Sequence, residues 1–399
     1  GKPEIRFKGY TDEWEQRKLS EIALQTYGGG TPKTANEEFW KGNIPWIQSS
    51  DLIEEQLFNV KPRKYISQEA ISKSATKLVP QNSIAIVTRV GVGKLAFMPF
   101  SYATSQDFLS LSDLKIEPEF AVYALYKMMQ LVSNEVQGTS IKGITKDELL
   151  AKEILIPGCE EQKKIGAYLH NLDHLITLHQ RKCDEIKSLK KYMLQKMFPQ
   201  NEQKVPEIRF KGFTEAWEQR KFGDYNDLMT GYPFESDKFS EDGIKLVRGM
   251  NVKRGYLDFS EDICVKWNSC VGLENYLLKD GDILIQMDGA LIGKSYAKIK
   301  KNQLPALLVQ RVTRARTNNK LASQDFMYQT IQRDFLRYIG MNKTETAVPH
   351  LSLNDIRNFE IMVPGLAEQN KIGTYFSNLD RLITLHQQKC EELKKIKKF

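Results

Sequence analysis

Long hydrophobic runs are absent from this chain of 399 residues: no apolar stretch approaches the roughly 18 residues that a membrane-spanning helix needs. The chain also opens with no charged and then apolar leader, and its five cysteines are an odd number. These absences favour reduced thiols over a disulfide framework. We therefore expect a cytoplasmic protein with no membrane contact.

Motifs of covalent chemistry are missing as well. None of the 14 prolines is adjacent to another, which excludes the proline-proline-aromatic loop that an adenine methyltransferase would need to hold a flipped base. The five histidines form no H-E-x-x-H pair. GALIGKS at 289–295 has only three residues between its glycines, and Asp288 stands where a phosphate-binding loop needs glycine. We therefore predict no catalytic residue in this chain.

What the chain has is the composition of a globular protein: 41% of its residues are hydrophobic and 27% are charged. Its length exceeds what one hydrophobic core usually supports, so we expect two or more domains. The 58 basic residues outnumber the 50 acidic ones and give a formal net charge of +8. This mild excess permits nucleic-acid binding without proving it.

The chain repeats its own opening. PEIRFKGYTDEWEQRK at 3–18 returns as PEIRFKGFTEAWEQRK, and 13 of 20 residues agree between 3–22 and 206–225, which we call the opening blocks. The helix blocks, 160–192 and 367–399, agree at 21 of 33 positions. A period of about 205 residues is far longer than that of solenoid repeats, so the chain is a duplicated domain.

Between the repeated blocks lie two bodies, 23–140 and 226–345, which share an outline but little sequence. Each body has a glycine- and proline-rich start and a strand-like run that ends in a glycine–lysine loop, and a strand ending in Pro-Gly follows it. The two loops are VGVGK at 90–94 and GALIGK at 289–294. This divergence within a common outline indicates one task performed on two different targets.

Each helix block carries an apolar seam with steps of three and four residues, the heptad pattern of helices packed lengthwise. The seam residues are Ile165, Leu169, Leu172, Ile176, His179, Cys183, Ile186, Lys190, Met193 and Met197 in the first copy, and Ile372, Phe376, Leu379, Ile383, His386, Cys390, Leu393 and Lys397 in the second. One seam per half predicts an antiparallel helical pair. Some 33 helical residues give about 50 Å, or about one to one and a half turns of DNA. The plain alternative is a dimerisation coiled coil with no measuring role.

The seams also place His179 four residues before Cys183, and His386 four residues before Cys390. Two histidines and two cysteines would suit zinc if the helices crossed there. A seam histidine and a small buried cysteine are the commoner outcome, so we predict no metal site.

The doubled opening block, the divergent bodies and the IPG…EQKKIGAYL…LDHLITLHQRK helix with its second copy carry a resemblance. Over essentially its whole length, the chain resembles the DNA-specificity subunit of a type I restriction–modification system. The resemblance implies a non-catalytic subunit that binds double-stranded DNA. Its parts would be target recognition domain 1 at 1–158, a spacer helix at 159–200, target recognition domain 2 at 201–365 and a distal spacer helix at 366–399.

The resemblance also implies a division of labour. Each recognition domain would read one half of a split, asymmetric site, while the helices would set the unread gap and dock two methyltransferase subunits. Two restriction subunits would complete the complex. S-adenosylmethionine, ATP and Mg would be bound by these partners, and this chain would bind no cofactor.

Base edges are read by side chains with paired donors or with a donor and an acceptor, such as Arg for guanine and Asn or Gln for adenine. We predict DNA contacts in polar, glycine-bearing loops, where glycine admits a close phosphate and lysine neutralises it. The candidates are Thr31, Lys33, Arg89, Lys94, Gln106, Gln137, Ser140 and Lys142 in the first body, and Arg248, Asn251, Arg254, Lys294, Gln310, Arg311, Asn342, Lys343, Thr344 and His350 in the second. Plain hairpin turns and solvated surface groups are the alternatives. RVTRAR at 311–316 alternates like a strand on an exposed sheet edge.

The aromatic residues of the opening blocks, Phe7, Trp14, Phe210 and Trp217, are interpreted as anchors that pin each half onto its helix, because burying such rings is strongly favourable. The predicted fold class is α+β: two pseudo-symmetric target recognition domains separated by a long antiparallel two-helix coiled coil. A second function class stays open, a non-catalytic assembly scaffold with a coiled-coil dimerisation rod. Divergent bodies favour DNA, because a scaffold with two like partners would keep its bodies alike.

Overall fold

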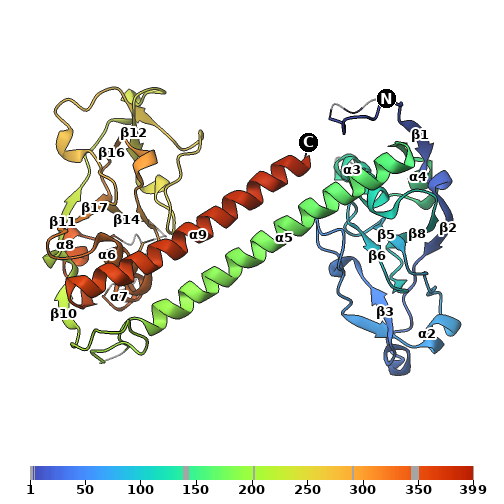
Figure 1. The fold of residues 1–399 in the computed structure, drawn as a ribbon, viewed down its shortest axis with the longest axis horizontal. Helices are drawn as coiled ribbons and strands as arrows, with labels where there is room; N and C mark the ends of the chain where they lie inside the picture. The colour runs from blue at the N-terminus through green and yellow to red at the C-terminus, as the bar shows by residue number, and fades with distance from the viewer. Residues whose placement is uncertain are drawn as a thin grey trace. The chain divides into compact units, whose positions relative to one another are not determined.

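A computed structural model describes residues 3, 5–137, 143–200, 203–289, 292–342 and 350–398. The chain forms two compact units, Gly1–Leu178 with Cys390–Phe399, and His179–Lys389. Each unit contains one body and a part of both long helices (Figure 1). Within the described residues, no helix is both long enough and apolar enough to cross a membrane.

The opening block of each half forms a short strand that pairs with the strand before Pro-Gly. The pairs are β1 (Glu15–Lys18) with β9 (Glu153–Ile156), and β10 (Glu218–Lys221) with β18 (Glu360–Val363). Both pairs are antiparallel and have the same register, with the first residue of one strand opposite the last residue of the other. The strand of each opening block therefore joins the segment before each body to the segment after it by β-pairing.

The first body contains two small sheets. One is antiparallel, in the order β2 (Ala23–Gly28), β8 (Phe108–Leu114), β5 (Ser83–Val87), β6 (Leu95–Met98). The other has the order β4 (Lys64–Ile66), β3 (Ile44–Ile47), β7 (Ala103–Thr104), and its β3–β7 pair is parallel. Strand β5 reads SIAIV and is buried along its whole length, as expected for a short, continuous apolar run.

Helices α2 (Gln68–Lys73) and α3 (Pro118–Gln137) belong to the first body, and α1 (Leu19–Ile22) and α4 (Lys146–Ala151) flank it. Helix α3 packs against the four-stranded sheet, since Phe120 and Met129 share one hydrophobic cluster with Ile84 of β5. The capping box of Thr145 and Glu148 begins α4; the segment 138–142 before it lies outside the described residues. The main core therefore lies between the sheet and α3.

The second body repeats this topology. Its sheets have the orders β11 (Asn226–Thr230), β17 (Val312–Thr317), β14 (Ile283–Gln286), β15 (Tyr296–Lys298), and β13 (Lys266–Trp267), β12 (Ile244–Val247), β16 (Ala306–Leu308). Its helices are α6 (Gln324–Thr330), the π-helical turn η8 (Ile331–Phe335) and α7 (Leu336–Asn342), and α8 (Leu353–Arg357) follows the body. Short 3-10 turns connect the strands of both bodies: η1 (Glu37–Trp40), η2 (Ser49–Asp51), η3 (Phe222–Asp224), η4 (Ser236–Lys238), η5 (Gly249–Asn251), η6 (Glu274–Tyr276) and η7 (Lys301–Gln303). The predicted common outline is confirmed.

The segment 311–316 is not the exposed sheet edge that its alternation suggested. Strand β17 lies inside its sheet, between β11 and β14, and five of its six residues are buried. Arg314 forms an ion pair with Asp227, and Arg316 forms two hydrogen bonds to Asp282 at 2.8 and 2.6 Å. The prediction was wrong because carboxylates from distant segments neutralise these arginines inside the fold.

The helix blocks form α5 (Cys159–Lys196) and α9 (Leu366–Lys398). Within each unit, the contacts between α5 and α9 follow one order: as residue numbers rise along α5, they fall along α9. These contacts are His179–His386, Cys183–Ile383 and Lys190–Asp380 in the second unit, and Ile176–Cys390 and Asp173–Lys397 in the first. The predicted antiparallel pairing is confirmed.

One ion pair occurs in both units with the roles of the helices exchanged. Lys190 Nζ lies 2.6 Å from Asp380 Oδ1, and Lys397 Nζ lies 2.6 Å from Asp173 Oδ1. Burial lowers the pKa of Lys190, while Asp380 acts in the opposite direction. A shift of one helix along the other would leave a largely buried ammonium unpaired, so the pair fixes the register.

The seam histidines meet, but the cysteines do not join them. His179 Nδ1 lies 2.9 Å from His386 Nδ1. Each cysteine sulfur instead contacts a carbonyl oxygen of the other helix, Cys183 that of Ile383 and Cys390 that of Ile176. Each cysteine follows its histidine by four residues, and because the helices are antiparallel, the two cysteines lie on opposite sides of the histidine pair. No group of three or more potential metal ligands occurs in the described part of the chain.

The opening blocks are anchored on the helices, as predicted. The aromatic contacts are Phe7 with Tyr168, Trp14 with Phe120, Phe210 with Tyr375, and Trp217 with Phe198 and Phe326. A buried ion pair accompanies them in each half. Arg6 makes two hydrogen bonds of 2.7 Å to Glu161, and Arg209 makes two of 2.8 and 2.7 Å to Glu368.

Candidate nucleic-acid interface

The ends of two strands and the start of a third lie together on one side of the four-stranded sheet in the first body, at the strand ends and not along an outermost strand. Strands β2 and β5 end there, and β8 begins there, because β2 and β5 both run antiparallel to β8. Five of the predicted DNA-contacting residues follow or precede these ends: Thr31, Lys33, Arg89, Lys94 and Gln106. All are exposed except the half-buried Lys94. We call the surface formed by these five residues the first edge.

Hydrogen bonds join the segments of the first edge. Thr88 N donates to Asp107 O at 2.7 Å, which ties the end of β5 to the start of β8. Thr31 Oγ1 donates to Gln106 Oε1 at 2.6 Å, so two predicted residues are in direct contact. This bond orients the Gln106 carboxamide and leaves its NH2 group as a donor.

The second body presents an equivalent edge, at the ends of β11 and β14 and the start of β17. We call Arg254, Lys294, Gln310, Arg311 and His350 the second edge; all five are exposed. Gln310 stands two residues before β17, as Gln106 stands two residues before β8. The fold therefore places the two predicted glutamines at matching positions.

The late loop of each body returns to its edge. In the first body, Ile144 N donates to Thr88 O at 2.8 Å; in the second, Leu351 N donates to Met287 O at 2.6 Å. His350 also forms a β-bridge with Asp288. Other candidates of these loops fall outside the described residues, either entirely (Ser140, Lys142, Lys343 and Thr344) or in their side chains (Gln137 and Asn342).

The side chains of two candidates in the second body, Asn251 and Arg248, form hydrogen bonds within the protein. Asn251 is completely buried: its Oδ1 accepts from Arg248 N at 3.0 Å and its Nδ2 donates to Asp258 O at 2.9 Å. Arg248 Nη2 donates to Ile263 O at 2.6 Å, and burial lowers the pKa of the Arg248 guanidinium. Asn251 holds a turn, and its amide does not reach the surface.

Gln48 occupies in the first body the place that Arg248 has in the second. Both residues follow a strand of the three-stranded sheet, and both donate their backbone N–H to a side chain three residues later, Asp51 or Asn251. Gln48 is half-exposed and accepts a hydrogen bond from Lys64 Nζ at 3.4 Å. The correspondence is visible in the shared spacing of IPWIQSSD at 44–51 and IKLVRGMN at 244–251.

The glycine–lysine loops are turns between antiparallel strands, β5 to β6 and β14 to β15. Gly91, Gly93, Gly289 and Gly293 have φ values of 94°, 104°, 90° and 71°, a region that favours glycine. An ATPase phosphate-binding loop leads from a strand into a helix. A strand, and not a helix, follows each of these loops.

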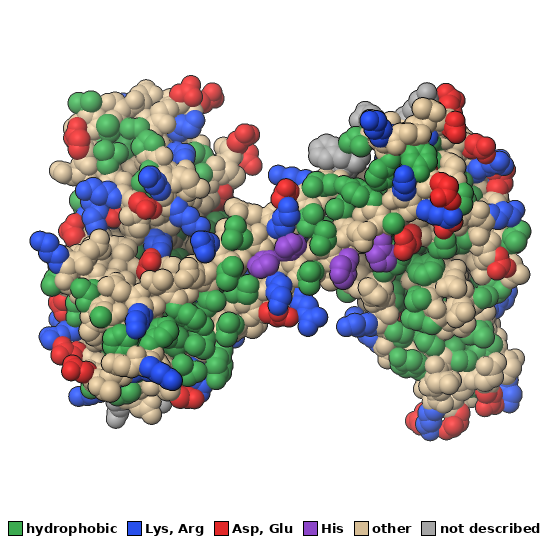
Figure 2. All heavy atoms as spheres, in the orientation of Figure 1, with side chains coloured by type: hydrophobic (Ala, Val, Ile, Leu, Met, Phe, Trp, Pro, Cys, Tyr) green, Lys and Arg blue, Asp and Glu red, His purple; other side chains and the backbone are tan. Residues whose placement is uncertain are grey.

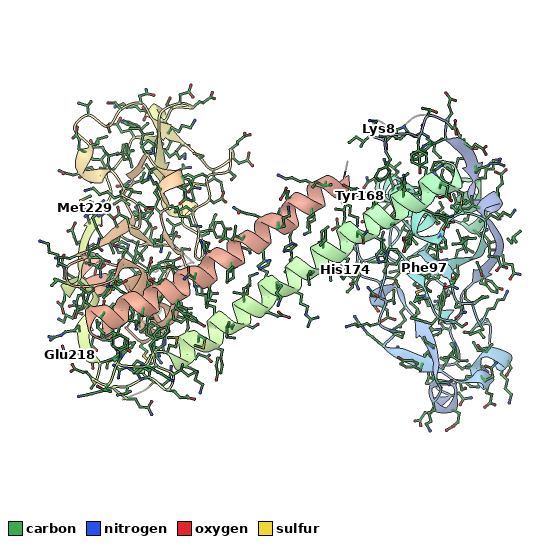
Figure 3. The ribbon with its side chains drawn as sticks, in the orientation of Figure 1. Lys8, Phe97, Tyr168, His174, Glu218 and Met229 are labelled. Carbon is green, nitrogen blue, oxygen red and sulfur yellow. The ribbon has the colours of Figure 1, made fainter. Side chains whose placement is uncertain are left out.

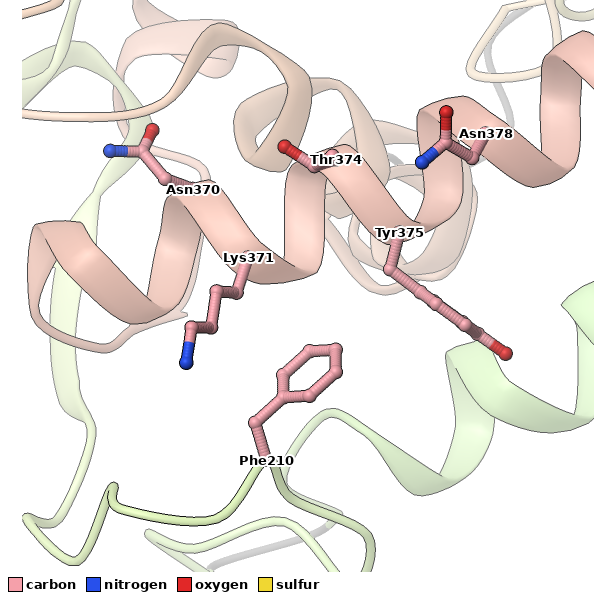
Figure 4. A pocket seen from close by; sticks show the side chains of 6 residues that line it. All are labelled: Phe210, Asn370, Lys371, Thr374, Tyr375 and Asn378. Carbon is pink, nitrogen blue, oxygen red and sulfur yellow. The ribbon is translucent and has the colours of Figure 1, made fainter.

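A cavity of 370 Å³ lies between the second opening block and α9 (Figure 4). Its lining is Phe210, Asn370, Lys371, Thr374, Tyr375 and Asn378. The one charged lining group, Lys371, lies with its Nζ 5.0 Å from the centre of the Phe213 ring. This lining contains no acid–base pair, so it offers no set of residues for catalysis.

Basic side chains are distributed over both units among acidic ones on the face shown in Figure 2. Several arginines of the second unit are held by carboxylates, as in the pairs Arg314–Asp227 and Arg316–Asp282. Net charge alone therefore does not mark a DNA surface on this face. Exposed polar residues group at the two sheet edges, where the sequence predicted DNA contacts.

Comparison with known proteins shows which family the chain resembles. The family model for the type I restriction modification DNA specificity domain matches residues 11–188 and again residues 214–395. The type I restriction enzyme MjaIX specificity subunit of Methanocaldococcus jannaschii is 24% identical, over 96% of this chain and 91% of its own length. The type I restriction enzyme EcoAI specificity subunit of Escherichia coli is 30% identical over 46% of this chain and 30% of its own length.

A solved structure shares the fold. The S subunit of a type I restriction-modification system from M. genitalium has a TM-score of 0.67 at 16% identity and covers 98% of this chain and 96% of its own. With one family domain in each half and the same fold over the whole chain, this protein belongs to the type I restriction modification DNA specificity family.

Proposed function

We propose that this chain is the DNA-reading subunit of a type I restriction–modification complex, and that each body recognises one half of a split, asymmetric duplex site. One observation carries the proposal: the two edges are built on the same backbone hydrogen bonds but display different side chains. Thr88 N to Asp107 O at 2.7 Å corresponds to Met287 N to Arg311 O at 2.9 Å. A conserved scaffold with variable exposed groups suits the reading of two different sequences.

Within this proposal the edge residues divide by chemistry. Gln106, Gln310, Arg89 and Arg311 carry the groups that pair with base edges, and we assign base contacts to them. Lys33, Lys94 and Lys294 are assigned to phosphates, where a point charge is sufficient. The remaining candidates of the late loops, Gln137, Ser140, Lys142, Asn342, Lys343 and Thr344, stay part of the proposed contact surface, as do Thr31, Arg254 and His350.

The helical pair carries a second feature, an exposed apolar stripe. Large side chains that the α5–α9 seam leaves exposed recur at equal positions in the two helix blocks: Leu175 and Leu382, Leu178 and Leu385, Leu189 and Ile396. Tyr168, labelled in Figure 3, extends the stripe on α5. Apolar side chains that stay exposed in both copies mark an interaction site. We assign the stripe to the docking of methyltransferase subunits, two because the stripe occurs twice.

This docking can be tested with one substitution. Leu385→Lys places a charge on the stripe, and we expect it to weaken co-purification with the methyltransferase subunit at least tenfold. The reason is that removing the charged ammonium group from water at an interface costs free energy. Leu321→Lys is the matched control, because Leu321 is 51% exposed and Leu385 is 52% exposed. Equal retention of the partner by both variants would contradict the assignment.

Catalysis belongs to the partners in this proposal. The methyltransferase subunits would bind S-adenosylmethionine and methylate adenine, and two restriction subunits would use ATP and Mg. The support from this chain is the absence of a catalytic motif in its sequence and of an acid–base pair in the described cavity. Action on cellular DNA places the proposed complex in the cytoplasm.

The decisive experiment maps methylated adenines in cells that carry this chain and its methyltransferase. We expect a two-part motif with a constant unread gap. A continuous motif, or no methylation that depends on this chain, would refute the proposal. Filter binding with specific and random duplexes separates DNA reading from the scaffold alternative, which predicts no difference between them.

A further inference from the structure

Arg311 is a residue of the second edge whose guanidinium is held by another side chain. Its Nη1 lies 2.6 Å from Oδ2 of Asp288, and the Arg311 side chain is 68% exposed while that of Asp288 is 20% exposed. Within the described residues, no further hydrogen bond is made by the Arg311 side chain. Two neighbouring donors, Nε and Nη2, are thus left for a ligand.

The backbone around this pair is fixed on both sides. Met287 N donates to Arg311 O at 2.9 Å, and Gln286 Nε2 donates to Asp288 O at 2.8 Å. His350 forms a β-bridge with Asp288. Because both main chains are tied down, the carboxylate presents the guanidinium in a defined direction.

Arg311 also has a φ of 67°, in the left-handed region that non-glycine residues rarely adopt. An exposed ion pair contributes little to stability, so the pair with Asp288 does not explain an arginine in this strained position. Strain at an exposed and chemically capable residue points to function.

The equivalent positions of the first edge carry the opposite charges. Arg89 follows Thr88, as Asp288 follows Met287, and Asp107 takes the place of Arg311. One backbone hydrogen bond corresponds between the sites, Thr88 N to Asp107 O and Met287 N to Arg311 O, but the positive φ occurs at Arg311 and not at Asp107. A charge reversal around a shared backbone hydrogen bond, together with the positive φ of Arg311 alone, indicates that these positions distinguish the two bodies.

We infer that Arg311 reads a guanine in the half-site of the second body through Nε and Nη2, with Asp288 as a positioning residue. The inference rests on the proposed function. Guanine offers O6 and N7 as two acceptors in the major groove, and two neighbouring guanidinium donors match their spacing. The ion pair with Asp288 restricts the side chain before DNA arrives, which reduces the entropy lost on binding.

The test uses the purified complex of this chain with its methyltransferase subunit and duplexes that carry each base at each position of the second half-site. We expect Arg311→Gln to reduce the preference for guanine at one position roughly ten- to a hundredfold. Preferences at the other positions and in the first half-site stay unchanged. Arg311→Lys does not restore the preference, because an ammonium lacks the planar pair of donors.

Asp288→Asn is nearly isosteric and keeps the test valid if Arg311 variants fold poorly. It should weaken the same guanine preference and no other. Arg220→Gln is the matched control, because Arg220 Nη2 lies 2.6 Å from Glu218 on an exposed strand of the opening block, and it should leave every preference unchanged.

The outcomes separate this inference from the proposed function. If the unmodified complex distinguishes bases in the second half-site and Arg311→Gln retains every preference, the inference is wrong and the proposed function stands. An equal loss of affinity for all duplexes assigns Arg311 to a phosphate and also overturns it. If the unmodified complex prefers no duplex sequence, the proposed function itself fails.

Discussion

Single residues of the opening blocks hold each half of the molecule together. The buried Arg6–Glu161 and Arg209–Glu368 pairs have the same two-hydrogen-bond geometry, although the bodies between them have diverged. A guanidinium matches a carboxylate through two parallel N–H groups, which a lysine cannot reproduce. The repeat of these arginines is thus explained by packing and ion pairing, with no role in DNA contact required.

Removing one of these arginines should destabilise its unit strongly. Arg209→Ala leaves Glu368, whose side chain is 2% exposed, as a buried carboxylate without its partner. We expect the free energy of unfolding to fall by about 3 kcal/mol, since loss of one partner of a buried pair typically costs about 3–5 kcal/mol. Urea denaturation followed by tryptophan fluorescence measures it. Arg220→Ala breaks an exposed pair and should have a much smaller effect; equal losses would contradict the prediction.

A buried tyrosine should make the first unit sensitive to alkali. Burial raises the pKa of Tyr102 to about 12, while hydrogen bonds with Ser83 and Ser110 act in the opposite direction. The unfolded tyrosine loses its proton near pH 10, so between about pH 10 and 12 deprotonation favours the unfolded state by about 1.4 kcal/mol per pH unit. Stability is thus retained below pH 10 and lost as the pH rises.

The comparison with Tyr102→Phe isolates this effect. Urea midpoints measured across this pH range should fall less steeply for the variant than for the unmodified protein, whatever the variant's stability at neutral pH. Parallel pH profiles of the two proteins would show that Tyr102 does not titrate as described.

At the scale of elements, each long helix uses two faces. The seam face of α5 packs on α9 through Cys183 and Lys190, while Leu178 and Leu189 remain exposed. Repetition of both patterns in α9 indicates two separate requirements, one for pairing within the chain and one for the proposed docking. The seam runs along the helix, and neither the first edge nor the second edge contains a residue of α5. We therefore expect that the length of α5 can change without altering either edge.

An insertion into α5 tests the role of helix length. Four residues added after the exposed Ser188 lengthen the helix by about 6 Å, and coiled coils accommodate such an insertion by local unwinding. We expect the methylated motif to gain a longer unread gap with unchanged half-site letters, as read by methylome sequencing. The same insertion after Lys320, in an exposed turn, should leave the gap unchanged. Altered half-site letters would count against a spacer role for the helix.

At the scale of the whole molecule, the duplication extends through every sheet. The strand orders of the two bodies correspond, and the β1–β9 and β10–β18 pairs close both bodies in the same register. Each body has its own hydrophobic clusters, such as that around Ile84 and Phe120 in the first. We therefore expect the bodies to be exchangeable between the closing strand pairs.

Exchange of one body should change one half of the DNA site. Replacing residues 23–140 with the corresponding segment of a related chain keeps the opening block, β9 and the helix blocks of the recipient. We expect methylome sequencing to show a new first half-site with the second half-site and the gap retained; the reciprocal exchange of 226–345 should do the opposite. A change in both half-sites after a single exchange would overturn the modular organisation.

The sequence by itself determined the duplication, the antiparallel seam and the aromatic anchors, because identity between copies and heptad spacing are local patterns. It also located the sheet edges through their glycine-bearing loops, including Gln106 and Gln310. Only the tertiary structure decided that Asn251 is buried, that β17 lies inside its sheet and that Asp288 holds Arg311. Such outcomes depend on which distant carboxylate or carbonyl reaches a side chain, and that is a property of long-range packing which no local pattern records.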